Sequence, residues 1–143
     1  MEINEAFYQR ILERRNAHNP FANLIGIVTT EIREGYAKGY FDLKEELGNA
    51  IGSIHGGCLY ALADTVVGAA CASYGYVAPT VSGSMNFLST LKKGNRVWAE
   101  ATTLKHGKKI SVFDVRVTDE GGKLLATATF TYYHTEIPLE AEN

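Results

Sequence analysis

The chain has 143 residues, of which 45% are hydrophobic and 21% charged, and its formal net charge is −2. This length suits a single domain, residues 1–143, with a sizeable core, and it is short for two domains. The small negative charge argues against a broad nucleic-acid-binding face, so nucleic acid is not an expected partner.

Residues 1–19 predict an amphipathic helix over Asn4 to Arg15 that presents Phe7 and Ile11 on one face and ends at Asn19-Pro20. Charges occur throughout this segment, which therefore lacks the apolar core of a signal peptide. No run of the chain is long and apolar enough for a comfortable membrane span. We therefore expect a cytoplasmic protein with no membrane contact.

Alternating patterns predict six strands. Two are expected between Leu24 and Leu43, with a turn at Gly35. Four more follow residue 74, separated by glycine-containing turns at 92–95, 105–108 and 119–122: Thr80 to Leu91, Arg96 to Leu104, Ile110 to Thr118 and Lys123 to Thr135. Connections this short make consecutive strands antiparallel neighbours.

The segment 53–74 predicts a long central helix that is apolar or small on every face from Gly57 to Ser73. A helix of this kind must be enclosed on all sides. A sheet can curl around part of it, and self-association would close the rest, so we expect at least a dimer. Cys58 and Cys71 lie roughly 20 Å apart along such a helix and cannot form a disulfide.

Asp64 carries the single charge of this helix. An ionised carboxylate in apolar surroundings needs compensation. It is either a satisfied core aspartate or a carboxylate at the wall of a cleft that serves as general base or nucleophile. The turn His55-Gly56-Gly57 is by itself an ordinary helix entrance, but its free amides can also bind an oxygen that becomes negative during a reaction.

This order of elements resembles the hotdog fold, an α+β architecture in which an antiparallel sheet wraps a long helix. The motifs His55-Gly56-Gly57 and Leu62-Ala63-Asp64-Thr65 more closely resemble acyl-CoA thioesterases of the phenylacetate-degradation (PaaI-like) type. The resemblance runs from about Phe21 to Thr135. It implies hydrolysis of an aryl- or medium- to long-chain acyl-CoA to the free acid and coenzyme A.

The resemblance also implies roles for five residues. Asp64 would be the base or nucleophile, the Gly56 amide the oxyanion donor, and His55 a contact to the thioester region. Asn49 would position water or substrate, and Ser82 would hold the water or the carboxylate. Asn49 could equally cap its own turn, and Ser82 could be a serine on the solvent face of a strand.

The basic turn Lys105-His106-Gly107-Lys108 is the candidate contact to the phosphates of coenzyme A, although lysines in a hairpin also keep a sheet edge soluble. No cofactor is implied, because coenzyme A is part of the substrate. The four histidines, at positions 18, 55, 106 and 134, have no metal-binding spacing. In dimers of the resembling family the glycine turn of one subunit faces the acid of the other, and we expect a homodimer at least, or a homotetramer.

Two other functions remain open at this point. The first is a hydratase or dehydratase of acyl thioesters on the same fold, which would pair its acid with a histidine such as His55. The second is a non-catalytic protein that binds acyl-CoA.

Overall fold

The computed structural model describes residues 2–91 and 94–139. Its first element, α1 (Glu5–Ala17), begins where the side chain of Asn4 accepts a hydrogen bond from the Phe7 amide. This agrees with the predicted N-terminal helix. Phe7 and Ile11 on its inner face are buried, as the pattern indicated.

A second short helix, α2 (Pro20–Ile25), was not predicted and replaces the start of the expected strand at Leu24. Asn19 accepts from the Ala22 amide as its N-cap, and Pro20 occupies the first turn, where a missing N–H costs nothing. Asn19-Pro20 thus ends one helix and begins the next. Gly26, with φ 92°, then ends α2.

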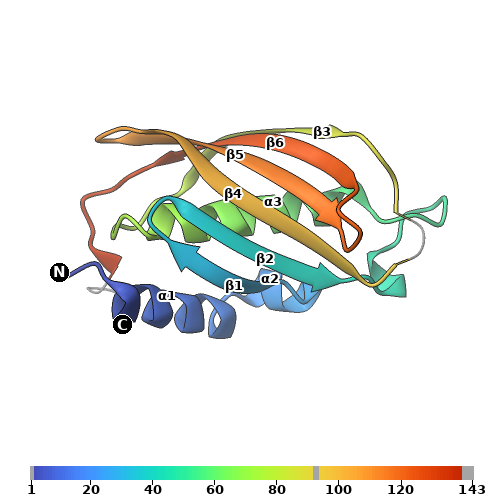
Figure 1. The fold of residues 1–143 in the computed structure, drawn as a ribbon, viewed down its shortest axis with the longest axis horizontal. Coiled ribbons are helices and arrows are strands. Elements are labelled where there is room, and N and C mark those ends of the chain that lie inside the picture. The colour runs from blue at the N-terminus through green and yellow to red at the C-terminus, as the bar shows by residue number, and fades with distance from the viewer. Residues whose placement is uncertain (1, 92–93, 140–143) are drawn as a thin grey trace.

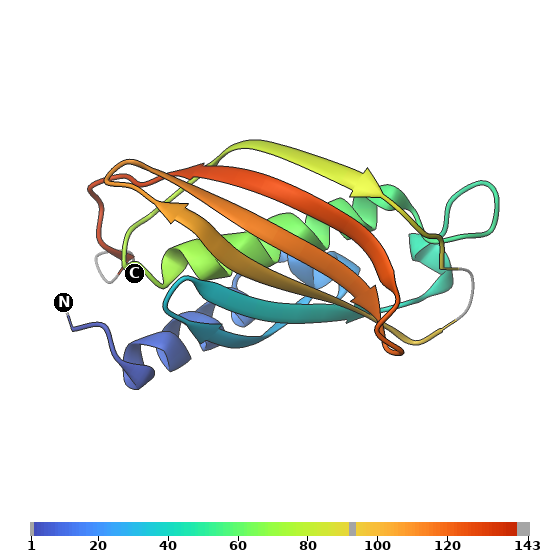
Figure 2. The ribbon, with the colours of Figure 1, turned by 45° about the horizontal axis from the view of Figure 1, so that its top comes forward.

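The six strands form one antiparallel sheet in the order β1-β2-β4-β5-β6-β3. Their bounds are β1 (Val28–Arg33), β2 (Tyr36–Asp42), β3 (Thr80–Phe87), β4 (Arg96–His106), β5 (Ile110–Asp119) and β6 (Leu124–Tyr133). A single 3₁₀ turn, η1 (Glu45–Leu47), follows β2. Consecutive strands are antiparallel neighbours, as predicted, except that β3 lies beyond β6 at the far edge (Figures 1 and 2).

The central helix α3 (Gly56–Ala72) lies against the concave side of this sheet, inside the predicted range 53–74 (Figure 2). Eleven of its seventeen residues are buried. Cys58 and Cys71 are both free thiols, as expected from their separation. α1 packs against β1 and α3, so it covers the side of the helix opposite β3.

One flank of α3 and the whole of β3 stay uncovered. In β3 every residue except Met85 is exposed, including Val81 and Phe87, which are more than half exposed. On α3 the open flank carries Gly57 and Tyr60, with His55 at its beginning. This is the side of the helix for which the sequence predicted an additional cover.

Several strand boundaries differ from the predictions, and β6 for example ends at Tyr133 instead of Thr135. β3 ends at Phe87, short of Leu91, and β4 continues to His106, so two residues of the predicted basic turn belong to a strand end. Lys92 and Lys93 of the first predicted turn lie outside the described residues. Within the described part of the chain, no helix is long and apolar enough to cross a membrane.

Candidate active site

Asp64 lies on α3 where the helix faces the ends of β3 and β6. Two hydroxyl groups contact the same carboxylate oxygen, Oδ1: Oγ1 of Thr80 at 2.8 Å and the phenol oxygen of Tyr132 at 2.6 Å. The Tyr132 hydroxyl also lies 2.8 Å from the Asp64 carbonyl oxygen. Among the described residues, no donor contacts the other oxygen, Oδ2. The carboxylate is therefore held at one oxygen and open at the other.

The sheet register explains why Thr80 and not Ser82 makes this contact. Thr80 pairs with Tyr132, and a β-bulge follows, so Ser82 pairs with Thr131. Successive residues of a strand point to opposite faces, and Thr131 therefore lies on the face away from α3. The structure does not bring Ser82 to the Asp64 of its own chain, and the role implied for Ser82 stays a prediction.

Burial, followed by the negative charge and the hydrogen bond of Asp64, raises the pKa of Tyr132. The phenol therefore keeps its proton throughout the range in which enzymes usually work. A protonated phenol is a permanent donor to the carboxylate.

The turn before α3 has the geometry of a helix N-terminus. His55 is the N-cap, and its Nδ1 accepts from the Gly57 amide at 2.8 Å. No acceptor for the Gly56 amide is found in the described part of the chain. A Cβ at Gly56 would lie 2.9 Å from Cε1 of Phe87, so glycine allows the end of β3 to pack directly on the turn. The free Gly56 amide is available to an incoming oxygen.

Asn49 holds the loop that leads into this turn. Its Oδ1 accepts from the amides of Ile51 and Ser53, and its Nδ2 donates to Ser53 Oγ at 2.9 Å and to the Ile54 carbonyl at 3.3 Å. Of the two predicted roles, these bonds are those of a residue that caps its own turn. Asn49 thereby fixes the position of His55 and Gly56.

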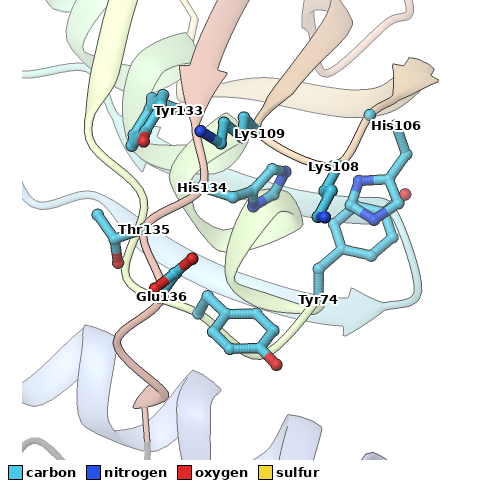
Figure 3. Close-up of a pocket in the computed structure, with 10 residues that line it drawn as sticks. Tyr74, His106, Lys108, Lys109, Tyr133, His134, Thr135 and Glu136 are labelled. Carbon is cyan, nitrogen blue, oxygen red and sulfur yellow. The ribbon is translucent and has the colours of Figure 1, made fainter.

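The basic turn lines a surface pocket of about 400 Å³ (Figure 3). His106, Gly107, Lys108 and Lys109 come from the β4–β5 connection. The other lining residues come from the segment after α3 and from the end of β6: Tyr74, Tyr76, Tyr133, His134, Thr135 and Glu136. Lys105 is exposed and does not line the pocket.

A network of side chains joins three lining residues of this pocket through the buried Ser111. The Ser111 hydroxyl lies 2.7 Å from His106 Nδ1 and 2.6 Å from His134 Nε2. The ring of Tyr74 stacks on His106 with centroids 3.6 Å apart. No sequence pattern connected these residues, because they come from four separate segments.

The residues that contact Asp64 adjoin one lining residue of the pocket along the sheet. Pro79 and Tyr133, which pair through a 3.0 Å backbone hydrogen bond, directly adjoin Thr80 and Tyr132. Gly56, in contrast, precedes Asp64 by eight residues on the same helix, a separation of about 12 Å at 1.5 Å per residue. Adjacent residues of β6 thus link the pocket to Asp64, whereas Gly56 of the same chain lies well away from Asp64.

An antiparallel sheet wrapped around a long central helix is the architecture of hotdog-fold proteins, and this chain has it. The Thioesterase superfamily matches residues 51–126, and the chain belongs to this family. The predicted fold and the PaaI-like resemblance are both confirmed.

Two known proteins illustrate the relationship. The acyl-coenzyme A thioesterase PaaI of Escherichia coli is 30% identical over 117 residues, covering 78% of this chain and 84% of PaaI. A solved structure of the E. coli PaaI protein superimposes with a TM-score of 0.88 at 24% identity, over 93% of this chain and 96% of that one. The smu.793 protein of Streptococcus mutans, solved bound to acetyl-CoA, has a TM-score of 0.72 at 28% identity, over 76% and 88%.

Proposed function

We propose that this protein hydrolyses the thioester bond of an aryl- or medium- to long-chain acyl-CoA, with Asp64 as the reacting carboxylate. The observation that carries the proposal is the state of Asp64, which two hydroxyl groups hold at Oδ1 while Oδ2 stays open. Membership of the Thioesterase superfamily and the name of the E. coli relative support the substrate class.

The chemistry requires a base or nucleophile and a donor for the oxyanion. Asp64 either takes a proton from water, whose oxygen attacks the carbonyl carbon, or attacks that carbon itself. The C–S bond then breaks, and the sulfur of coenzyme A leaves as a thiolate. In the first route the proton that Asp64 took from water passes to this sulfur. In the second route water hydrolyses the mixed anhydride between Asp64 and the acyl group, which releases the free acid, restores the carboxylate and supplies the proton for the sulfur. The Gly56 amide, at the N-terminus of α3, would stabilise the negative carbonyl oxygen. These groups need no additional cofactor, since coenzyme A is part of the substrate.

The 12 Å between Gly56 and Asp64 argues that two chains build each site. Thr80, at one end of β3, contacts Asp64, and Phe87, at the other end, lies against Gly56. If two β3 strands pair antiparallel about their centres, Phe87 of one chain lies beside Thr80 of the other. This pairing would bring the Gly56 turn of one chain to the Asp64 of its partner.

The exposed edge of β3 favours this pairing. A free strand edge presents unpaired N–H and C=O groups and readily accepts a second strand. Pairing would also cover Val81 and Phe87 and the open flank of α3 around Tyr60, which are exposed in the single chain. We therefore propose a homodimer formed through β3 as the active unit, whether or not dimers associate further into tetramers.

The pocket beside Asp64 suits the nucleotide end of coenzyme A. Lys108 and Lys109 offer positive charge for the phosphates, and the exposed ring of Tyr76 offers a surface for the adenine. Gly107 closes the turn with a 2.8 Å hydrogen bond to the Ile110 carbonyl. Tyr133 of the pocket follows Tyr132, which contacts Asp64, so we propose that one bound molecule extends from the pocket to Asp64.

The test is hydrolysis of a panel of acyl-CoAs, from acetyl to palmitoyl and including phenylacetyl and hydroxybenzoyl, measured by released thiol. We expect turnover of at least one member and a loss of about 10²-fold or more in Asp64→Asn. Asp114→Asn, on β5, is the matched control. An inert wild-type protein that still binds acyl-CoA, or an Asp64→Asn variant with full activity, would contradict the proposal. Hydration of crotonyl-CoA in place of hydrolysis would support a hydratase.

A further inference from the structure

The N-terminal helix α1 brings a cation close to Asp64. Arg15, in the last turn of α1, extends toward α3, and its Nη2 donates to the Thr65 carbonyl at 3.2 Å. Its Nε is buried and has no hydrogen-bond partner among the described residues. The guanidinium thus lies under the helix next to the residue that carries the carboxylate. Arg15 also lies outside residues 51–126, which the family matches.

Gly68, one turn after Asp64, leaves the space that the guanidinium uses. A Cβ at this position would lie 2.7 Å from Arg15 Nη2 and 3.4 Å from the Tyr132 hydroxyl. Arg15 and Tyr132 therefore meet at the same side of α3. Tyr132 in turn contacts Asp64 directly.

The charges of Arg15 and Asp64 depend on one another. A buried cation is costly unless an anion offsets it. Burial lowers the pKa of Arg15, and the nearby Tyr132 and Asp64 act in the opposite direction. An ionised Asp64 is the group that can compensate Arg15.

We propose that Arg15 and Tyr132 are positioning residues that stabilise the negative charge of the Asp64 carboxylate and direct its Oδ2 toward the reacting carbonyl. The N-terminal helix is thereby part of the active site. This inference rests on the proposed function, because it assumes that Asp64 is the reacting group.

The groups that face Asp64 come from three other elements. They are Arg15 from α1, Tyr132 from β6 and the uncharged hydroxyl of Thr80 from β3. Cys71, further along α3, interacts with Arg15, and burial raises the pKa of Cys71 to about 12, so its thiol stays neutral. Arg15 and Tyr132 are therefore the residues whose removal takes a charge or a hydrogen-bond donor from the surroundings of the carboxylate.

The experiment measures kcat/KM for the best acyl-CoA of the panel against pH, because its acid limb reports the essential base of the free enzyme. We expect Tyr132→Phe and Arg15→Gln to move this limb to higher pH by about one unit, since each removes a donor or charge that favours the carboxylate. Their kcat should fall by about 10-fold or more. Arg15→Lys, which keeps the charge, should have an acid limb close to that of the wild type.

Gly68→Ala provides an independent variant, because the added methyl group displaces the flexible end of Arg15 without removing it. Alanine favours a helix more than glycine does, so a loss of activity here would not come from unfolding. We expect the acid limb of Gly68→Ala to move to higher pH, by less than that of Arg15→Gln. The matched controls are Arg14→Gln, next to Arg15 in α1, and Tyr40→Phe, in β2. Both should keep the wild-type dependence of kcat/KM on pH.

Asp64→Asn separates the two proposals. If Asp64→Asn is inactive and the acid limb of Tyr132→Phe and Arg15→Gln coincides with that of the wild type, the positioning role is wrong and the proposed function stands. If Asp64→Asn is active, the proposed function itself fails.

Discussion

His134 shows how burial sets the protonation of a single residue. It is buried at the end of β6, with Ser111 Oγ 2.6 Å from Nε2 and Cys71 Sγ 3.8 Å from Nδ1. Burial, and secondarily the imidazole of His106, lowers the pKa of His134. The folded protein therefore prefers the neutral ring, while the unfolded chain binds a proton near the usual value of about 6.5.

Because the unfolded state binds more protons in this range, the free energy of unfolding should rise with pH. The contribution of His134 is fully present above about pH 6.5 and is lost as pH falls below that value. Urea unfolding between pH 5 and 8 measures it. We expect His134→Asn to have a smaller slope than the wild type, and His18→Asn, at an exposed position, to keep it. An unchanged slope in His134→Asn would contradict this explanation.

Some residues of the site could be identified from the sequence, and others could not. Asp64 was identifiable because a single charge on an apolar helix needs an explanation. Tyr132 and Thr80 were not, because a tyrosine in an apolar strand reads as core and a threonine as an ordinary strand residue. Only the register of β3 with β6 brings them to Asp64. Arg15 was equally hidden in a helix that reads as an amphipathic cover.

Among the elements, the β4–β5 connection and the end of β6 together form the basic side of the pocket. Lys108 and Lys109 project from the turn, and His134 follows β6 (Figure 3). Exposed lysines attract phosphate through a charge interaction that salt screens. If they bind the nucleotide, their effect is on substrate binding rather than on the chemical step.

We expect Lys108→Ala/Lys109→Ala to raise KM for acyl-CoA by about 10-fold at low salt, with kcat nearly unchanged. The matched substrate is the same acyl group on pantetheine, which lacks the nucleotide and its 3′-phosphate. Its KM should be the same in both proteins. Equal losses with both substrates would show that the lysines act on folding or on the acyl site instead.

The elements also show where patterns failed. The predicted strands and α3 agree with the structure in type and order. The strands have a period of two, whereas α3 is apolar on every face, so the two patterns are easily told apart. α2 was missed because Asn19-Pro20 signals the end of one helix and the start of another equally well. The bulge after Thr80 could not be predicted from the local pattern, and it decides which hydroxyl faces Asp64.

For the whole molecule, the order of elements, which resembles the hotdog fold, predicted the fold class, and the need to enclose an all-apolar helix predicted a second copy. The sheet and α1 enclose α3 on most sides, and the flank beside β3 stays open. The same geometry separates Gly56 from Asp64 by about 12 Å. Both facts point to a second copy, whose arrangement no pattern in one sequence can specify.

The most direct measurement is activity of a mixed dimer of Asp64→Asn and Gly56→Pro chains, purified through two different affinity tags. Proline at the first helical position removes the amide hydrogen and adds a ring whose Cβ would lie 2.9 Å from Cε1 of Phe87. His55, with φ −71° and ψ 129°, already has the backbone that precedes a proline. Gly56→Ala, which adds a Cβ and keeps the N–H, is the control.

Each homodimer should be nearly inactive. The mixed dimer should recover about half of the wild-type activity, because one of its two sites combines an intact Asp64 with the partner's intact Gly56. No recovery in a stable mixed dimer would contradict an active site shared between two chains.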